Sequence, residues 1–220
     1  MLKKFSEVKY IIPIVKLMKR QYRMRQVIVV PYRAQEKTTV ANFDNIIQWV
    51  LYQEDDHKNP GKIVDLGDGA GLTRLGLTQR WHQADLPMNF FSTLPFPQAV
   101  VVAKNVYRKT YWNPLSGDLI SSDQVAAPLL SFAINDNVQV AVKTLQHVLD
   151  VTQDGVLGPK TLAELNSKDP DTVARMFRTY WVLFYKNDVV LNPSKQRFLD
   201  GWIVRANFPY PSPLVSEIYQ

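Results

Sequence analysis

The stretch TTVANFDNIIQWVLYQE, residues 38–54, decides the fold class. Its apolar residues repeat with the i, i+3, i+4, i+7, i+8 spacing of one helix face: Phe43, Ile46, Ile47, Val50 and Leu51. We predict a helix capped by Asn42 or a preceding threonine, with this face buried. Glu54 continues the same face at the C-terminal end. Its carboxyl group is therefore expected at the edge of the core, where partial burial and the helix dipole favour the protonated form. The alternative is an ordinary glutamate at a helix end.

A glycine-rich stretch, GDGAGLTRLGLTQRW, follows at residues 67–81. The segment 55–71 has no helical period, so we expect a loop or small hairpin there, with helical spacing resuming from Leu75. Further on, we predict a helix that passes through Val100 and Tyr107 and reaches the aromatic pair at residues 111–112.

The rest of the chain is helical in pattern. Residues 125–166 indicate three helices with short turns at 154–155 and 158–159, and two more helices are expected near 170–185 and 194–206. Strand signals are few, so the predicted fold class is mainly α. The expected domains are a basic arm at 1–38, a catalytic region at 39–120, and a helical lobe with a proline-rich tail at 121–220.

The amino-acid composition excludes some classes of chemistry and limits the expected partners. The chain of 220 residues has no cysteine, which excludes thiol chemistry, and its three histidines lie far apart, so we expect no metal site and no cofactor. The net charge is +6, with +8 in residues 1–40 and −2 in the remainder. A basic arm suits nucleic acid, anionic lipid or the anionic bacterial wall, or it is a solvated extension. The sequence has no nucleic-acid-binding motif, so nucleic acid is not an expected partner.

Targeting signals are weak. No apolar run approaches 18 residues, so no transmembrane segment is expected. Residues 10–18 are apolar, but they include a lysine and lack a small-residue cleavage site, which makes a poor signal peptide. We therefore expect synthesis in the cytoplasm, export through a secretion or lysis partner that the arm could contact, and action on the cell wall in the periplasm or outside the cell.

The residue types around the glycine-rich stretch suit cleavage of a glycosidic bond. A sugar acetal needs an acid that protonates its leaving oxygen, and a second group that stabilises the positive centre or positions water. Glu54 fits the first role, and Asp68 or its neighbour Asp65 fits the second. Thr73 is a candidate to hold the water, and the glycines allow a bulky sugar chain to approach the turn.

These residues also carry a resemblance. Glu54, LGDGAGLTRLGLTQ, the YW pair and SFAIN resemble glycoside hydrolase family 108, the lysozyme-like N-acetylmuramidases. AVKTLQHVLDVTQDGVLGPKTLAEL and NPSKQRFLDGWIVRA are similar to the peptidoglycan-binding module that accompanies that family. The resemblance covers about residues 40–206. It implies a lysozyme-like helical fold, cleavage of the MurNAc–GlcNAc β-1,4 linkage, Glu54 as general acid, no cofactor, and peptidoglycan as substrate and partner.

The chain departs from the family pattern near the acid. Asp55 and Asp56 stand where the family has two glycines, and Ala70 replaces the first glycine of a pair. The interval from Glu54 to Thr73 is also longer than usual. A second hypothesis follows, in which the protein is a non-catalytic peptidoglycan-binding or scaffold protein derived from such an enzyme.

Substrate contacts are expected from three residues. Tyr111 and Trp112 could stack on sugar rings or pack in the core, and Asn135 could bind an acetamido group or cap the next helix.

Other polar residues of the second half have structural alternatives. Gln146, Asp154 and Gly155 are expected to shape turns, while Arg178 either faces an anionic peptide stem or lies on a solvated helix face. Arg205 is expected to make a structural cation–π contact with Trp202.

Overall fold

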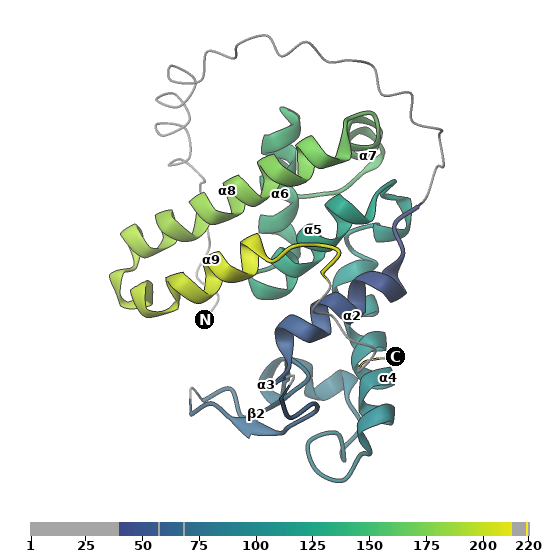
Figure 1. Cartoon of the computed structure of the whole chain (residues 1–220), viewed down its shortest axis with the longest axis vertical. Coiled ribbons are helices and arrows are strands. Elements are labelled where there is room, and N and C mark those ends of the chain that lie inside the picture. The colour runs from purple at the N-terminus through teal and green to yellow at the C-terminus, as the bar shows by residue number, and fades with distance from the viewer. Residues whose placement is uncertain (1–39, 57, 68, 213–218, 220) are drawn as a thin grey trace. The chain divides into compact units, whose positions relative to one another are not determined.

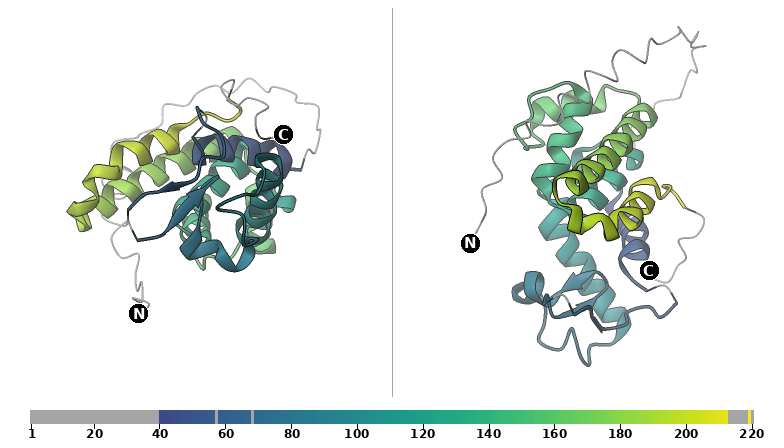
Figure 2. Two further views of the ribbon diagram at one scale, coloured as in Figure 1. Left: turned by 90° about the horizontal axis from the view of Figure 1, so that it is seen from below. Right: turned by 90° about the vertical axis from the view of Figure 1, so that its left-hand side faces the viewer.

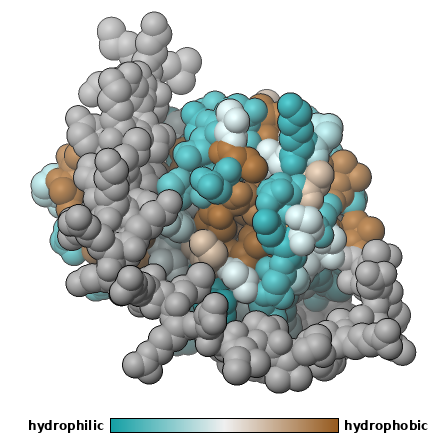
Figure 3. All heavy atoms as spheres, turned by 90° about the horizontal axis from the view of Figure 1, so that it is seen from above, coloured by the Kyte–Doolittle hydropathy of each residue, from teal (hydrophilic) through white to brown (hydrophobic). Residues whose placement is uncertain are grey.

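The structure is a computed structural model that describes residues 40–56, 58–67, 69–212 and 219. Helices dominate it, with a small antiparallel sheet beside them, so the predicted mainly α fold class is confirmed (Figure 1). One hydrophobic core cluster takes side chains from both sides of residue 120, where we expected the border between catalytic region and lobe. Within the described part of the chain, no helix is long and apolar enough to cross a membrane. Figure 3 shows hydrophobic patches interspersed with hydrophilic side chains on one face.

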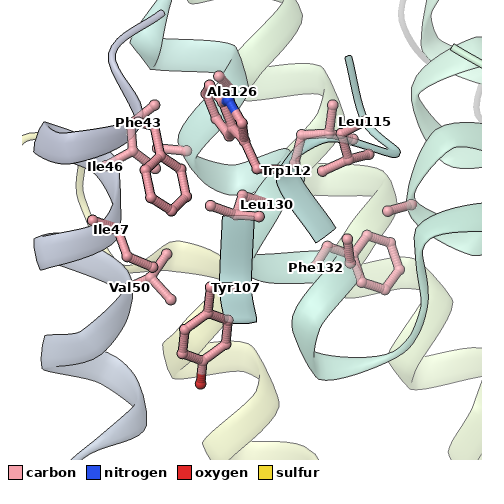
Figure 4. Packing of buried hydrophobic residues seen from close by; sticks show 14 of the residues in the cluster. Phe43, Ile46, Ile47, Val50, Tyr107, Trp112, Leu115, Ala126, Leu130 and Phe132 are labelled. Carbon is pink, nitrogen blue, oxygen red and sulfur yellow. The ribbon is translucent and has the colours of Figure 1, made fainter. Parts of the chain in front are cut away.

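Helix α2, Phe43–Glu54, is the predicted amphipathic helix. The side chain of Asn42 caps it by accepting hydrogen bonds from the amides of Asp44 (2.9 Å) and Asn45 (3.3 Å). The apolar face packs into the core, where the side chains meet those of later helices (Figure 4). Burial of this face fixes the rotation of the helix, and this rotation also fixes the direction in which its last residue, Glu54, points.

The sheet is a three-stranded antiparallel meander in the order β1 (Val64–Asp65), β2 (Leu72–Arg74) and β3 (Leu77–Thr78). The strands lie at the end of α2 that carries Glu54 (Figure 1). Our prediction of a helix from Leu75 was wrong. Leu75 (φ 52°) and Gly76 (φ 74°) form a two-residue hairpin turn with positive φ at both positions, and only the short α3, Gln79–His82, follows.

Helix α4, Phe96–Tyr107, passes directly into a π-helical segment, η2, at Arg108–Trp112. The expected helix through Tyr107 to residues 111–112 is therefore present, with a change of helix type in its last turn. π-Helical turns are often found at functional sites, because the wider turn re-aims the side chains that follow it.

The second half contains α5 (Asp123–Asn135), α6 (Val138–Leu149), α7 (Pro159–Asn166), α8 (Pro170–Leu191) and α9 (Leu199–Asn207). These agree with the predicted helices. Helices α8 and α9 run side by side, linked by the 3-10 segment η4, Pro193–Phe198 (Figures 1 and 2).

Gln146 organises the turn between α6 and α7, as expected. This buried amide donates to the Asp154 carboxylate (2.7 Å), to the Val156 carbonyl (3.0 Å) and to the Thr161 hydroxyl (3.2 Å). Its oxygen accepts from the amide of Gly155 (2.9 Å). One side chain therefore satisfies four polar groups of an irregular loop, which explains the LQ, DG and T elements of the sequence pattern.

Candidate active site

Glu54 ends α2 and pairs with Arg205 of α9, 151 residues later. The guanidinium contacts both carboxylate oxygens, with Nη1 on Oε1 and Nη2 at 3.2 Å from Oε2. The side chains are 11% exposed for Glu54 and 17% exposed for Arg205. Glu54 therefore lies at the edge of the core, as predicted, and it is held as one half of a forked ion pair.

The hairpin turn of β2 and β3 lies directly against Glu54. A Cβ atom added to Gly76 would lie 2.6 Å from Cβ of Glu54 and 2.4 Å from the hydroxyl oxygen of Tyr107. The Tyr107 hydroxyl donates to the carbonyl of Leu75 in the same turn (3.0 Å). In Figure 4 this hydroxyl points away from the labelled aliphatic side chains. Glycine at position 76 thus allows the turn, the tyrosine and the acid to meet.

Three ring side chains surround this point. Burial, with Glu54 as the next cause, raises the pKa of Tyr107 well above its usual value. Burial and Glu54 likewise raise the pKa of Tyr111. The hydroxyl of Tyr111 lies 3.4 Å from Nε2 of His82, and burial lowers the pKa of that imidazole. All three rings therefore favour their neutral forms near neutral pH, so they add hydroxyl and imidazole hydrogen-bonding groups without adding charge.

Thr73 and Thr78 stand opposite each other on β2 and β3. Both hydroxyl oxygens are buried and have no hydrogen-bond partner among the described residues. Buried hydroxyls normally have partners, and a bound water or a substrate group is the usual explanation when none is seen. The predicted water-holding residue, Thr73, is therefore one member of a threonine pair close to the turn that touches Glu54.

Of the two acidic candidates for the second role, the structure describes only Asp65. Asp68 lies outside the described residues. Asp65 is exposed in β1 and its carboxylate accepts from the amide of Gly67 (2.9 Å). Asp55, which departs from the family pattern, accepts from the amide of Gly61 (2.7 Å) and from the Tyr219 hydroxyl (3.2 Å), so it holds the loop after α2. Across the described part of the chain, no group of acidic or histidine residues could hold a metal ion.

The three residues expected to contact substrate have different surroundings in the structure. Tyr111 is half-buried beside His82, near Glu54. Trp112 is buried in the core, and its indole N–H donates to Asp118 (2.8 Å), so it takes the core-packing alternative and has no face free for a sugar. Asn135, at the end of α5, donates to the hydroxyl of Tyr185.

Arg205 is the residue whose contact the sequence analysis predicted wrongly. We expected a structural cation–π contact with Trp202, but its guanidinium contacts Glu54, and Trp202 stacks on Tyr185 at 4.8 Å. Arg178 of α8 does not face solvent in the way we considered. It donates to the carbonyls of Ala206 (2.7 Å) and Phe208 (2.9 Å), and so caps the end of α9.

Residues 140–207 match the family model described as "Predicted Peptidoglycan domain". The chain is a peptidoglycan-associated protein. Among solved structures, SagA of Brucella abortus is similar, with 28% sequence identity and a TM-score of 0.58 over 74% of this chain and 88% of that chain. No curated protein matches. The matched domain includes Arg205, so one residue of a peptidoglycan domain contacts the carboxyl group of Glu54.

Proposed function

We propose that this peptidoglycan-associated protein is an N-acetylmuramidase that cleaves the MurNAc–GlcNAc β-1,4 linkage, as the resemblance to glycoside hydrolase family 108 implies. One observation carries the proposal. The carboxyl group of Glu54 is partly exposed at the end of a buried helix, between a glycine turn and a residue of the predicted peptidoglycan domain. A carboxyl group at such a position can be presented to a glycan strand held by that domain.

In the proposed reaction, protonated Glu54 delivers its proton to the bridging oxygen as the bond to the anomeric carbon breaks. The leaving sugar departs as an alcohol. Water then adds to the oxocarbenium-like centre and loses a proton to a carboxylate of the site, so that Glu54 can be protonated again for the next cycle. We assign the positioning of that water to Thr73 and Thr78, whose hydroxyls have no hydrogen-bond partner in the part of the chain that the structure describes. Asp68 or Asp65 would stabilise the positive charge, as proposed from the sequence. The substrate chain would lie along the hairpin.

The competing proposal is a non-catalytic wall-binding or scaffold protein. The observation that favours it is the ion pair itself, because the guanidinium of Arg205 occupies both carboxylate oxygens that a glycosidic oxygen would have to approach. Under either proposal the protein acts on the cell wall, in the periplasm or outside the cell, and residues 1–38 are proposed to contact a secretion or lysis partner.

Purified peptidoglycan sacculi distinguish the two. We expect the wild-type protein to release muropeptides with N-acetylmuramic acid at the reducing end, identified by mass spectrometry. Glu54→Gln should lower release by about 10²–10⁴-fold, the usual contribution of a general acid, while the protein still sediments with the sacculi. Glu164→Gln is the matched control and should keep full activity, because Glu164 is a half-exposed glutamate of α7 that pairs with Lys168 just after the helix. Binding without release by the wild type would establish the scaffold alternative.

A further inference from the structure

The ion pair between Glu54 and Arg205 suggests how the substrate is selected. Arg205 lies in the predicted peptidoglycan domain, and its partner is the proposed proton donor. We propose that Arg205 is a substrate-binding residue that exchanges the carboxylate of Glu54 for a carboxylate of the peptidoglycan strand. An anionic strand would then free the acid that cleaves it. This inference rests on the proposed function, which it deepens by naming the chemical group that is recognised.

The shape of the guanidinium supports the exchange. Two parallel N–H donors fit any carboxylate, so the fork on Glu54 is equally suited to a lactyl or peptide carboxylate of peptidoglycan. Neither partner is fully buried, with 17% of the Arg205 side chain and 11% of the Glu54 side chain exposed. Part of the Arg205 side chain therefore remains exposed to solvent beside Glu54.

Arg205 and Arg178 make different kinds of contact. Within the described residues, the hydrogen bonds that its side chain makes both go to Glu54. Arg178 makes the contacts that fix the end of this helix, through two main-chain carbonyls. The fold thus contains one arginine that ties the backbone and a second arginine whose partner is a single exchangeable carboxylate.

The ionisable groups around the ion pair of Glu54 and Arg205 determine what the exchange would change. The ionisable groups facing it are Tyr107 from α4, Tyr111 from η2, Tyr185 from α8 and Asp55 after α2. The hydroxyls are neutral, because burial raises the pKa of each tyrosine, that of Tyr185 to about 12. Arg205 is therefore the cation in contact with Glu54, and binding of its guanidinium to a substrate carboxylate would leave both oxygens of Glu54 free for the substrate.

Binding of two short ligands tests the exchange independently of cleavage. The probes are the GlcNAc–MurNAc disaccharide, whose lactyl carboxylate is free, and the disaccharide–peptide, whose carboxylates lie on the stem. Neither contains the MurNAc–GlcNAc linkage. Each is compared with the same compound after its carboxyl groups have been converted to amides. Dissociation constants are measured by calorimetry at pH 7 for the wild type, Glu54→Gln, Arg205→Met and Arg205→Lys.

Removal of the competing carboxylate should strengthen binding. We expect Glu54→Gln to bind at least one of the carboxylate probes about tenfold or more tightly than the wild type does, and to bind the amidated probes equally well. Arg205→Met should lose the preference for carboxylate over amide, and Arg205→Lys, which keeps the charge but not the fork, should retain part of it. The probe that shows the gain identifies the lactyl or the stem carboxylate as the ligand.

Arg197→Met is the matched control, because Arg197 is exposed on η4 and lies over the ring of Phe198, and it should leave the preference for carboxylate unchanged. Equal affinity of the wild type and Glu54→Gln for both carboxylate probes would overturn the exchange, and so would an unchanged preference in folded Arg205→Met. Failure of the proposed function appears in a different measurement, as intact sacculi with the wild-type protein.

Discussion

Substitution of Gly76 by alanine tests whether the hairpin turn positions Glu54. Gly76 has φ +74°, and an alanine Cβ there would lie 2.4 Å from the Tyr107 hydroxyl oxygen and 2.6 Å from Cβ of Glu54. Both distances are shorter than any ordinary van der Waals contact, so the turn, the tyrosine and the helix end must move apart. Gly69 has a similar φ of +79° with nothing within 4 Å of its added Cβ, which makes it the matched control.

Both alanine substitutions force a non-glycine residue into a left-handed conformation, but only Gly76→Ala also creates a steric clash. A left-handed conformation costs a non-glycine residue about 1–2 kcal/mol, and this applies at both positions. Overpacking of a close contact costs about 1–3 kcal/mol more, and this applies only at Gly76. We therefore expect Gly76→Ala to lower the free energy of unfolding by about 2–5 kcal/mol, and Gly69→Ala by no more than about 1–2 kcal/mol.

Urea unfolding measures the two free energies, and muropeptide release from sacculi measures the function. Gly76→Ala should also lose release out of proportion to its folded fraction, because the clash displaces the side chain of Glu54 itself. Equal destabilisation by both alanines, together with unchanged release, would show that the turn does not hold the acid.

Three further predictions concern the surrounding structure. Gln146→Leu should destabilise the fold by about 2–4 kcal/mol in urea unfolding, because it removes four hydrogen bonds, one of them to the buried hydroxyl of Thr161, whereas Gln153→Leu on the exposed side should change stability by less than about 0.5 kcal/mol. Trp112→Phe should lower the melting temperature without changing sedimentation onto sacculi, and lost binding in a folded variant would restore the stacking role. Burial lowers the pKa of His82 below its unfolded value of 6.5, so the stability from the neutral ring is complete above that pH and is lost as the pH falls. In His82→Asn the urea midpoint should vary less between pH 7.5 and 5, and an unchanged slope would contradict this assignment.

Local patterns predicted those parts of the fold that depend on neighbours along the chain. The cap and the buried face of α2 could be predicted from residues within the helix and directly before it. The role of Gln146 could be predicted from the turn motif that follows it in the sequence. The hairpin of β2 and β3 could not be predicted in this way. Leu75 adopts a positive φ that leucine does not favour, and its carbonyl is held by Tyr107, 32 residues later. A tertiary contact outweighed the helical spacing of the leucines.

In the candidate site too, some features could be predicted from local sequence and others could not. The position of Glu54 at a core edge followed from the helix period, whereas its partner Arg205 lies 151 residues away and no local pattern connects them. Tyr111 and Trp112 are adjacent in sequence, yet the π-helical turn directs one ring toward His82 and the other into the core. Sequence reasoning identified the aromatic pair, but only the geometry of that turn assigns the two rings to different tasks.

The C-terminal region holds α2 at both ends, and this bears on how the acid is positioned. At the start of α2, the amide of Asn42 donates to Asp123, and the same carboxylate accepts from the hydroxyl of Tyr210 (2.8 Å). Midway, the indole N–H of Trp49 donates to the carbonyl of Pro209 (2.7 Å). At its end, Glu54 meets Arg205. The segment at and after α9 therefore sets the position of the whole helix, and the proposed proton donor is aligned by the same segment that carries its exchangeable partner. Wall binding and bond cleavage would then depend on one continuous set of contacts.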